Sequence, residues 1–210
     1  MQITHYGHAC LLVETGSARL LIDPGTFSSG FESLRELTAV LITHQHVDHL
    51  DVERLPDLLA ANPDASLVTD TASAEQLAEK GVAAQAVRPG ERLSLGGTAV
   101  QTVGGRHAVI HRDIPVIPNV GYLVDGVLLH PGDSFHVPDE RVEVLALPTG
   151  APWLKAGEAV DYLRAVSPRI AVPIHEAVLA RPQLHYGMFS KLAPQGCTVR
   201  VLDRDQPTEL

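Results

Sequence analysis

The sequence predicts an α/β protein in which two β-sheets pack together and helices cover their outer surfaces. Short apolar runs typical of strands occur in two sets, and helical segments are interspersed among them, which is the order expected for two sheets with helices outside. The 210 residues are 45% hydrophobic, enough for a packed core, and contain no linker, low-complexity stretch or short repeat. We therefore expect a single domain over residues 1–210.

The first third of the chain is rich in predicted strands. Residues 9–15 and 18–23 are apolar runs separated by a Gly-Ser pair, which is a hairpin signal. Residues 37–43 form a continuous run of leucine and β-branched residues, typical of a strand buried on both faces. A short helix is expected over 52–63, where an Asn-Pro pair ends it.

The rest of the chain alternates strands with helices. A strand is expected at 66–70, followed by a helix over 71–81 that ends at a glycine. Strands and tight turns then fill residues 85–147. The remaining predicted elements are a helix over 157–168, a buried strand over 169–175, a helix over 186–196 and a strand over 197–203.

The composition narrows the classes of partner. The formal net charge is −9, which disfavours nucleic acid because phosphate contacts need a basic surface. No apolar run approaches the roughly 20 residues that cross a bilayer, and the first residues lack the basic region of a signal peptide. Cys10 and Cys197 lie too far apart in sequence to indicate a disulfide framework. We expect a cytoplasmic protein that acts on a small molecule, and its oligomeric state stays open.

Metal-ligating side chains gather where the predicted strand 37–43 ends. The segment 43–51 holds three of the eleven histidines and two aspartates. In an extended backbone residues i and i+2 point to the same side, so His44 and His46 project together. Asp48 and His49 are adjacent and share that face only if the chain turns there. Imidazole and carboxylate ligands suit zinc, iron or manganese, so this one segment can serve two metal ions.

Further ligand candidates lie at other strand ends. His107 follows a predicted strand and a Gly-Gly-Arg sequence, Asp133 follows a Pro-Gly pair, and His175 ends the predicted strand 169–175. Loops at the ends of rigid strands commonly carry functional residues. Together with segment 44–49 these positions supply more ligands than one tetrahedral site uses, which indicates a pair of metal ions.

The chain resembles the metallo-β-lactamase superfamily over nearly its whole length. The motif H-x-H-x-D-H at 44–49 is followed in order by His107, Asp133 and His175, and a strand-end aspartate, Asp23, precedes it. The segments that begin ITHYGH and PNVGYL also resemble the small single-domain branch that includes the ascorbate-6-phosphate lactonase-like proteins.

The resemblance implies a four-layer αββα sandwich with two divalent metal ions at one edge of the sheets. Zinc is the preferred metal, with manganese or iron as alternatives. The implied ligands are His44, His46 and His107 for the first metal ion, Asp48, His49 and His175 for the second, and Asp133 as the bridge between them. Asp23 is expected to orient the loop that carries the ligands without binding metal itself.

Three more histidines are candidates for substrate contacts. His8 belongs to the first predicted hairpin, and His111 and His136 follow His107 and Asp133 in the sequence. A structural role for each of these three stays open. Trp153 is expected to be a packing residue rather than a platform for substrate.

The residues and the resemblance together indicate hydrolysis. A hydroxide shared by two metal ions attacks a small ester, lactone or phosphoester, and the carboxylate of Asp48 orients it or moves a proton. No G-x-S-x-G sequence indicates a serine nucleophile. Two alternatives from other classes are a di-iron redox protein and a metal-binding protein without turnover.

Overall fold

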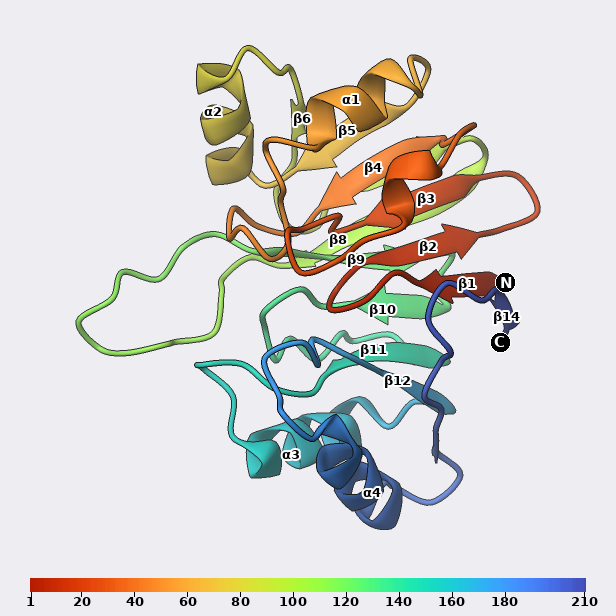
Figure 1. Cartoon of the computed structure of the whole chain (residues 1–210). Helices are drawn as coiled ribbons and strands as arrows, with labels where there is room; N and C mark the ends of the chain where they lie inside the picture. Colours follow the sequence, from red (N-terminus) through yellow and green to blue (C-terminus); the bar gives the residue numbers. More distant parts are fainter.

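The computed structural model describes all 210 residues and contains two seven-stranded sheets that pack against each other (Figure 1). The first sheet has the order β14-β1-β2-β3-β4-β5-β6, with β1 at Gln2–His5, β2 at Leu11–Glu14, β3 at Arg19–Ile22, β4 at Ala39–Ile42, β5 at Ser66–Thr69, β6 at Gln85–Ala86 and β14 at Thr208–Glu209. The second has the order β13-β12-β11-β10-β9-β8-β7, with β7 at Arg92–Leu95, β8 at Thr98–Gly104, β9 at Val120–Val124, β10 at Leu128–His130, β11 at Val144–Pro148, β12 at Ile170–Ile174 and β13 at Thr198–Val199.

The central core lies between the two sheets and follows from the two-residue period of the strands. Leu20 and Ile22 of β3 point into this core, whereas Leu21 between them packs on the outer face. In the second sheet Val144 points inward and Leu145 outward. Both faces of these strands are therefore buried, which explains why their sequences read as continuous apolar runs.

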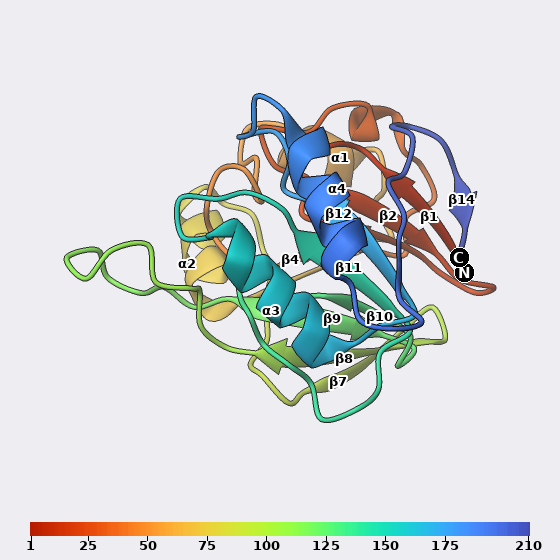
Figure 2. The same cartoon turned by 90° about the horizontal axis from the view of Figure 1, so that it is seen from below.

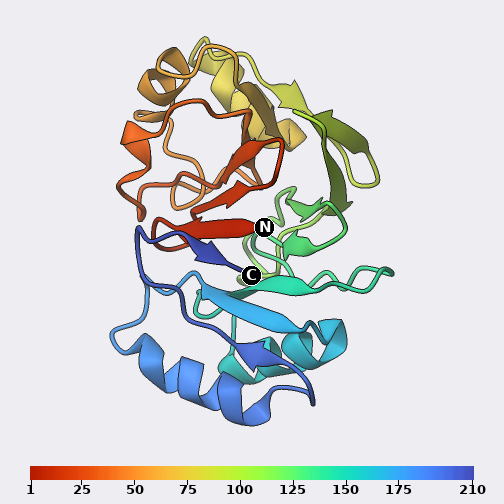
Figure 3. The same cartoon turned by 90° about the vertical axis from the view of Figure 1, so that its right-hand side faces the viewer.

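Helices cover the outer face of each sheet. The helices α1 (Leu55–Ala60) and α2 (Thr71–Glu79) lie on the first sheet, and α3 (Ala156–Val166) and α4 (Pro182–Leu192) lie on the second (Figures 2 and 3). A 3₁₀ turn, η1, spans Phe31–Ser33. The layers thus run helix, sheet, sheet, helix, and the predicted αββα sandwich is confirmed.

The strand directions bring the candidate site residues to one edge. In the first sheet β3 pairs in parallel with β4, so the residues after them, Asp23 and Thr43, emerge at the same end. In the second sheet β10, β11 and β12 are parallel, and their following loops carry Asp133, Gly150 and His175. Ligands at the carboxyl ends of parallel strands can therefore meet at one edge of the sandwich.

Some elements differ from the sequence prediction. The strands β1 and β14 were not predicted: β1 is a four-residue segment that pairs with β2 on one side and with β14 on the other, and the two-residue β14 forms only through this pairing between the two ends of the chain (Figure 3). The final helix begins at Pro182 rather than at 186, since proline is well suited to a first helical turn. The expected strand 197–203 is reduced to Thr198–Val199. None of the helices combines the length and apolar character needed to cross a membrane.

Candidate metal centre

Two groups of potential ligands lie side by side at this edge. In the first group the ligand atoms of His44, His46, His107 and Asp133 all lie within 4.8 Å of one another. His44 Nε2 is 3.1 Å from His46 Nδ1, and His107 Nε2 is 3.3 Å from Asp133 Oδ2. The turn after β4 delivers two of these histidines, and the loops after β8 and β10 deliver the other two residues.

The second group contains His8, Asp48, His49 and His175, again with ligand atoms within 4.8 Å of one another. The Nε2 atoms of His49 and His175 are 3.1 Å apart. Asp48 Oδ2 lies 3.0 Å from His8 Nε2 and 3.4 Å from His175 Nε2. The chain turns between His46 and Asp48, and this turn separates the two halves of the motif into two groups.

Asp133 faces both groups. Its Oδ1 is 3.0 Å from His49 Nε2 and 3.3 Å from His175 Nε2, while its Oδ2 is 3.3 Å from His107 Nε2. A single carboxylate thus presents one oxygen to each group. Burial raises the pKa of this carboxyl, but the facing His49 and His175 outweigh burial and hold its pKa well below the usual range.

Backbone groups and carboxylates hold the ligand histidines through their other ring nitrogen. His175 Nδ1 donates to the carbonyl of Gly150 at 2.6 Å, and His107 Nδ1 donates to the carbonyl of Ala108 at 2.5 Å. His49 Nδ1 donates to Asp23 Oδ2 at 2.7 Å. These bonds leave each Nε2 directed at the centre, which is the arrangement of metal-binding histidines.

Asp23 occupies the position expected of a residue that orients ligands. Its Oδ1 accepts from the backbone N–H of Thr43, and its Oδ2 accepts from the hydroxyl of Thr43, each at 2.8 Å. The same carboxylate therefore holds His49 and the start of the loop that carries the motif.

The loops around the centre depend on close backbone packing. A Cβ at Gly25 would lie 1.9 Å from the carbonyl oxygen of Asp48, so only glycine fits beside the motif. Three other residues here, His8, Asp23 and His175, have φ of 53°, 51° and 63°. Such left-handed conformations of non-glycine residues are uncommon and concentrate at functional sites.

The pKa values of the buried histidines shift in different directions. His44 is fully buried, and burial with the neighbouring His49 holds its pKa well below the ordinary value. Burial also acts to lower the pKa of His175, but the facing carboxylates of Asp133 and Asp48 outweigh it and raise this pKa to about 9. Burial therefore determines the direction of the pKa shift at His44, whereas the two carboxylates determine it at His175.

The donor set fits a pair of divalent cations. His107 Nε2 and Asp133 Oδ1 are buried atoms without a hydrogen-bond partner in the protein, and such atoms are rare unless an ion or water completes them. Imidazole nitrogens with carboxylate oxygens are ligands for zinc, manganese or iron.

The candidate substrate histidines lie in three different settings. His8 is fully buried inside the second group instead of facing a substrate cavity, because the β1–β2 turn carries its ring against His175 with ring centroids 3.8 Å apart. His111 is exposed and lies 3.6 Å from Asp113 in the loop between β8 and β9. His136 lines a cavity beside the centre.

Trp153 is closer to the chemistry than the sequence indicated. Its Nε1–H donates to Asp133 Oδ2 at 2.7 Å, and its ring lies 6.0 Å from the ring of His107, measured between centroids. No motif in the sequence marks this residue, because it follows the end of β11 by a loop whose path the sequence does not reveal.

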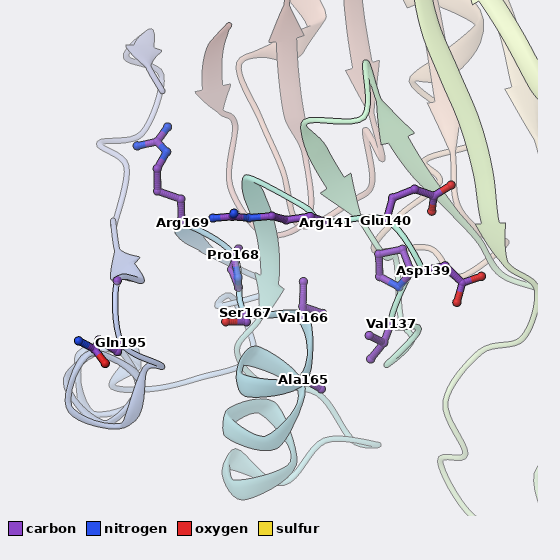
Figure 4. Close-up of a pocket in the computed structure, with 12 residues that line it drawn as sticks. Val137, Asp139, Glu140, Arg141, Ala165, Val166, Ser167, Pro168, Arg169 and Gln195 are labelled. Carbon is purple, nitrogen blue, oxygen red and sulfur yellow. The ribbon is translucent and has the colours of Figure 1, made fainter.

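Another hollow lies at the opposite edge of the second sheet and does not belong to the centre. It has a volume of about 460 Å³ and is bordered by the turn from α3 to β12 (Figure 4). Arg169 precedes β12 at this hollow, whereas His175 follows β12 at the metal centre, so the length of the strand separates them. Arg141 and Arg169 both lie near Glu143, at 3.7 and 3.2 Å.

The comparisons with known proteins agree with this architecture. A family model described as the beta-lactamase superfamily domain matches residues 2–175. Protein Rv0786c of Mycobacterium tuberculosis is 54% identical over 199 residues, covering 91% of this chain and 92% of that protein. A UPF0173 metal-dependent hydrolase of Pyrobaculum arsenaticum is 33% identical over 196 residues, covering 83% and 84%.

Solved structures show the same fold at low sequence identity. A metallo hydrolase from Ignicoccus hospitalis, Igni18, aligns with a TM-score of 0.76 at 21% identity, covering 100% of this chain and 98% of that one. The metallo-beta-lactamase fold protein YhfI from Bacillus subtilis aligns with a TM-score of 0.76 at 16% identity, covering 99% and 98%.

Proposed function

The chain belongs to the family described as the beta-lactamase superfamily domain, and on that premise we propose that this metal-dependent hydrolase uses two divalent cations to cleave a small ester, lactone or phosphoester. The observation that carries the proposal is Asp133, whose two oxygens face two separate groups of ligands. One carboxylate shared in this way supports a dinuclear centre rather than two unrelated sites.

Each residue has a proposed role at the centre. One cation would be held by His44, His46 and His107. The other would be held by Asp48, His49 and His175, and Asp133 would contribute to both sites. When bound, the cations lower the pKa of water and polarise the carbonyl or phosphoryl oxygen of the substrate. Zinc is the preferred metal for both sites. Manganese and iron are the alternatives, because they also accept mixed imidazole and carboxylate ligands.

Asp48 is the residue we propose for proton transfer. Its side chain is 19% exposed, whereas that of Asp133 is 4% exposed, so Asp48 is the carboxylate that solvent and substrate can reach. Burial acts to raise its pKa, but hydrogen bonds with His175 and His8 outweigh burial and lower it. The group is thus ionised at neutral pH and can orient the attacking water by accepting its hydrogen bond; because the lowered pKa makes it a weak base, a proton that it takes up passes readily to the leaving group.

The other residues of the centre act by position. His44 and His49 are fully buried and cannot swing into solvent, so their rings present fixed nitrogens. Asp23 and the carbonyl of Gly150 hold His49 and His175 in one tautomer. We also propose a cytoplasmic location, because Cys10 and Cys197 are too far apart in sequence to indicate the disulfide framework typical of secreted proteins.

Metal analysis combined with a substrate screen tests the proposal. Purified protein would be loaded with zinc, manganese or iron, freed of excess metal and assayed with generic 4-nitrophenyl esters, lactones and phosphodiesters. We expect two equivalents of metal per chain and turnover of at least one substrate class. Saturation at one equivalent would contradict the dinuclear centre. Iron without hydrolysis would favour redox chemistry, and bound metal without either activity would favour binding alone.

A further inference from the structure

A cavity of about 500 Å³ opens next to the metal centre, within the size range of small-molecule sites. Its walls come from segments that directly follow ligand candidates. Ala108 and Val109 follow His107, and Ser134, Phe135 and His136 follow Asp133. The loops that carry His107 and Asp133 therefore also form the walls of this cavity.

Trp153 contacts both the cavity and the metal centre. It lines the cavity, while its indole N–H donates to Asp133 Oδ2 at 2.7 Å. Its ring packs against Phe135, with centroids 5.0 Å apart. Occupation of the cavity is thus coupled through one side chain to the carboxylate between the two ligand groups.

The lining is apolar on one side and polar at its rim. Phe135 and Trp153 supply aromatic surface, and Val109, which is 60% exposed, adds an aliphatic group that an occupant can cover. Arg106 stands at the rim without an ion pair or a side-chain hydrogen bond in the structure. These features suit a ligand with an apolar body and a polar end.

The charges around the rim favour an anionic end. Glu158 is the only carboxylate that lines the cavity, and it is already engaged by Lys155, accepting from its backbone N–H at 2.8 Å and lying 4.0 Å from its Nζ. Burial lowers the pKa of His136, with Asp139 and Glu140 opposing, so this imidazole is neutral at pH 7 and can donate a hydrogen bond. Arg106 remains as the free fixed charge, and a guanidinium matches a carboxylate in geometry.

We propose that this cavity binds the non-reacting end of the substrate, and that this end is an apolar chain or ring that carries a carboxylate paired with Arg106. The inference rests on the proposed hydrolase function and narrows its substrate class to amphipathic monoanions. The scissile bond then lies at the ligand groups, which Trp153 contacts through Asp133.

Two probes with the same scissile bond test the inference. The mono-4-nitrophenyl ester of adipic acid is anionic, and 4-nitrophenyl heptanoate is a neutral analogue of similar length. The metal-loaded protein should cleave the adipate ester with the higher kcat/KM. Arg106→Gln should reduce kcat/KM for the adipate ester by about tenfold to a hundredfold, mainly through KM, and should reduce kcat/KM for the heptanoate by far less.

Arg112→Gln is the matched control. Arg112 lies in the same loop, its side chain is 87% exposed, and Asp113 lies 3.8 Å away. This variant should behave as the wild type with both esters, and metal content should be equal in all three proteins. Cleavage of both esters with no charge preference, or an equal effect of the two substitutions, would overturn the assignment and leave the hydrolase function standing.

A binding measurement separates failure of the inference from failure of the function. Trp153 is the only tryptophan in the chain, so its fluorescence reports on the cavity. The zinc-loaded protein would be titrated with 6-phenylhexanoate and with its neutral amide. Saturable quenching by the carboxylate that weakens about tenfold or more in Arg106→Gln but not in Arg112→Gln supports the site, even where no ester is cleaved. Equal binding of acid and amide contradicts it.

Discussion

Substitution of Asp133 by asparagine is the most direct test of the centre. The change keeps the shape of the side chain but removes its charge and one of its two acceptor oxygens. Trp153 Nε1–H can only donate, and it lies 2.7 Å from Oδ2. The amide oxygen will therefore turn to Trp153, and the NH₂ group will face His49 and His175. The second ligand group then loses its acceptor.

The size of the effect follows from the distances. The nearest imidazole nitrogens lie 3.0 and 3.3 Å from Asp133 Oδ1. A unit positive charge about 3 Å from a carboxylate gains roughly 5 kcal/mol at an effective dielectric constant of about 20. If structural relaxation and water recover half of this energy, about 2.5 kcal/mol of binding free energy is lost. This loss weakens the binding of a metal ion by roughly 70-fold. Both metal ions should bind less tightly in Asp133→Asn, the second more so.

The assay measures metal content and turnover under identical loading. Wild type, Asp133→Asn and Asp23→Asn would be equilibrated with the same excess of zinc, gel-filtered and measured by elemental analysis, with affinity determined by competition against a chromophoric chelator. Asp23→Asn is the control, because Asp23 reaches the centre only through Thr43 and His49; its effect on metal affinity should be milder than that of Asp133→Asn, which weakens both ligand groups together. Two equivalents of metal and normal turnover in Asp133→Asn would refute the bridging role.

Three further predictions follow from the same geometry. His107→Ala should empty the first group and leave the second largely loaded; a crystal structure of the variant with the opposite occupancy would contradict the assignment. Activity should fall below about pH 6, because ligand histidines must be neutral and their reference pKa is about 6.5; a rate that stays flat to pH 4.5 would show that histidines do not hold the working metals. In chelator-treated protein, His175 has a folded pKa of about 9, raised above the unfolded value of about 6.5. Its stabilisation, up to about 3 kcal/mol, is therefore fully present below about pH 6.5 and is lost as the pH rises through about 9. Thermal unfolding should show this loss in the chelated protein, whereas zinc-loaded protein should gain stability over the same range.

The sequence predicted the parts of the molecule that depend on local pattern. Continuous apolar runs identified β4 and β12, because both faces of these strands are buried. Strand-end positions identified Asp133 and His175, since parallel strands bring their carboxyl ends to one edge. The edge strand β14 escaped prediction because it depends on pairing with β1 between residues about 200 positions apart, such as Gln2 with Glu209.

The residues whose place at the centre the sequence left open reach it through tertiary contacts. His8 lies in a turn where Gly7 has φ of 92° and His8 itself has φ of 53°. This turn is held from the distant end of β12, where the N–H of His175 donates to the carbonyl of His8 at 2.8 Å. The same bond leaves the His8 ring against His175, and its Nε2 lies 3.0 Å from Asp48 Oδ2.

No local periodicity encodes that contact, because its partners are separated by more than 160 residues and meet only when the two sheets pack. A histidine buried against the carboxylate proposed for proton transfer restricts the positions that this carboxylate can take. Trp153 does the same for Asp133 from the other sheet. Each of the two carboxylates at the centre is thus held by a side chain whose position depends on the packing of the whole sandwich rather than on the segment around it.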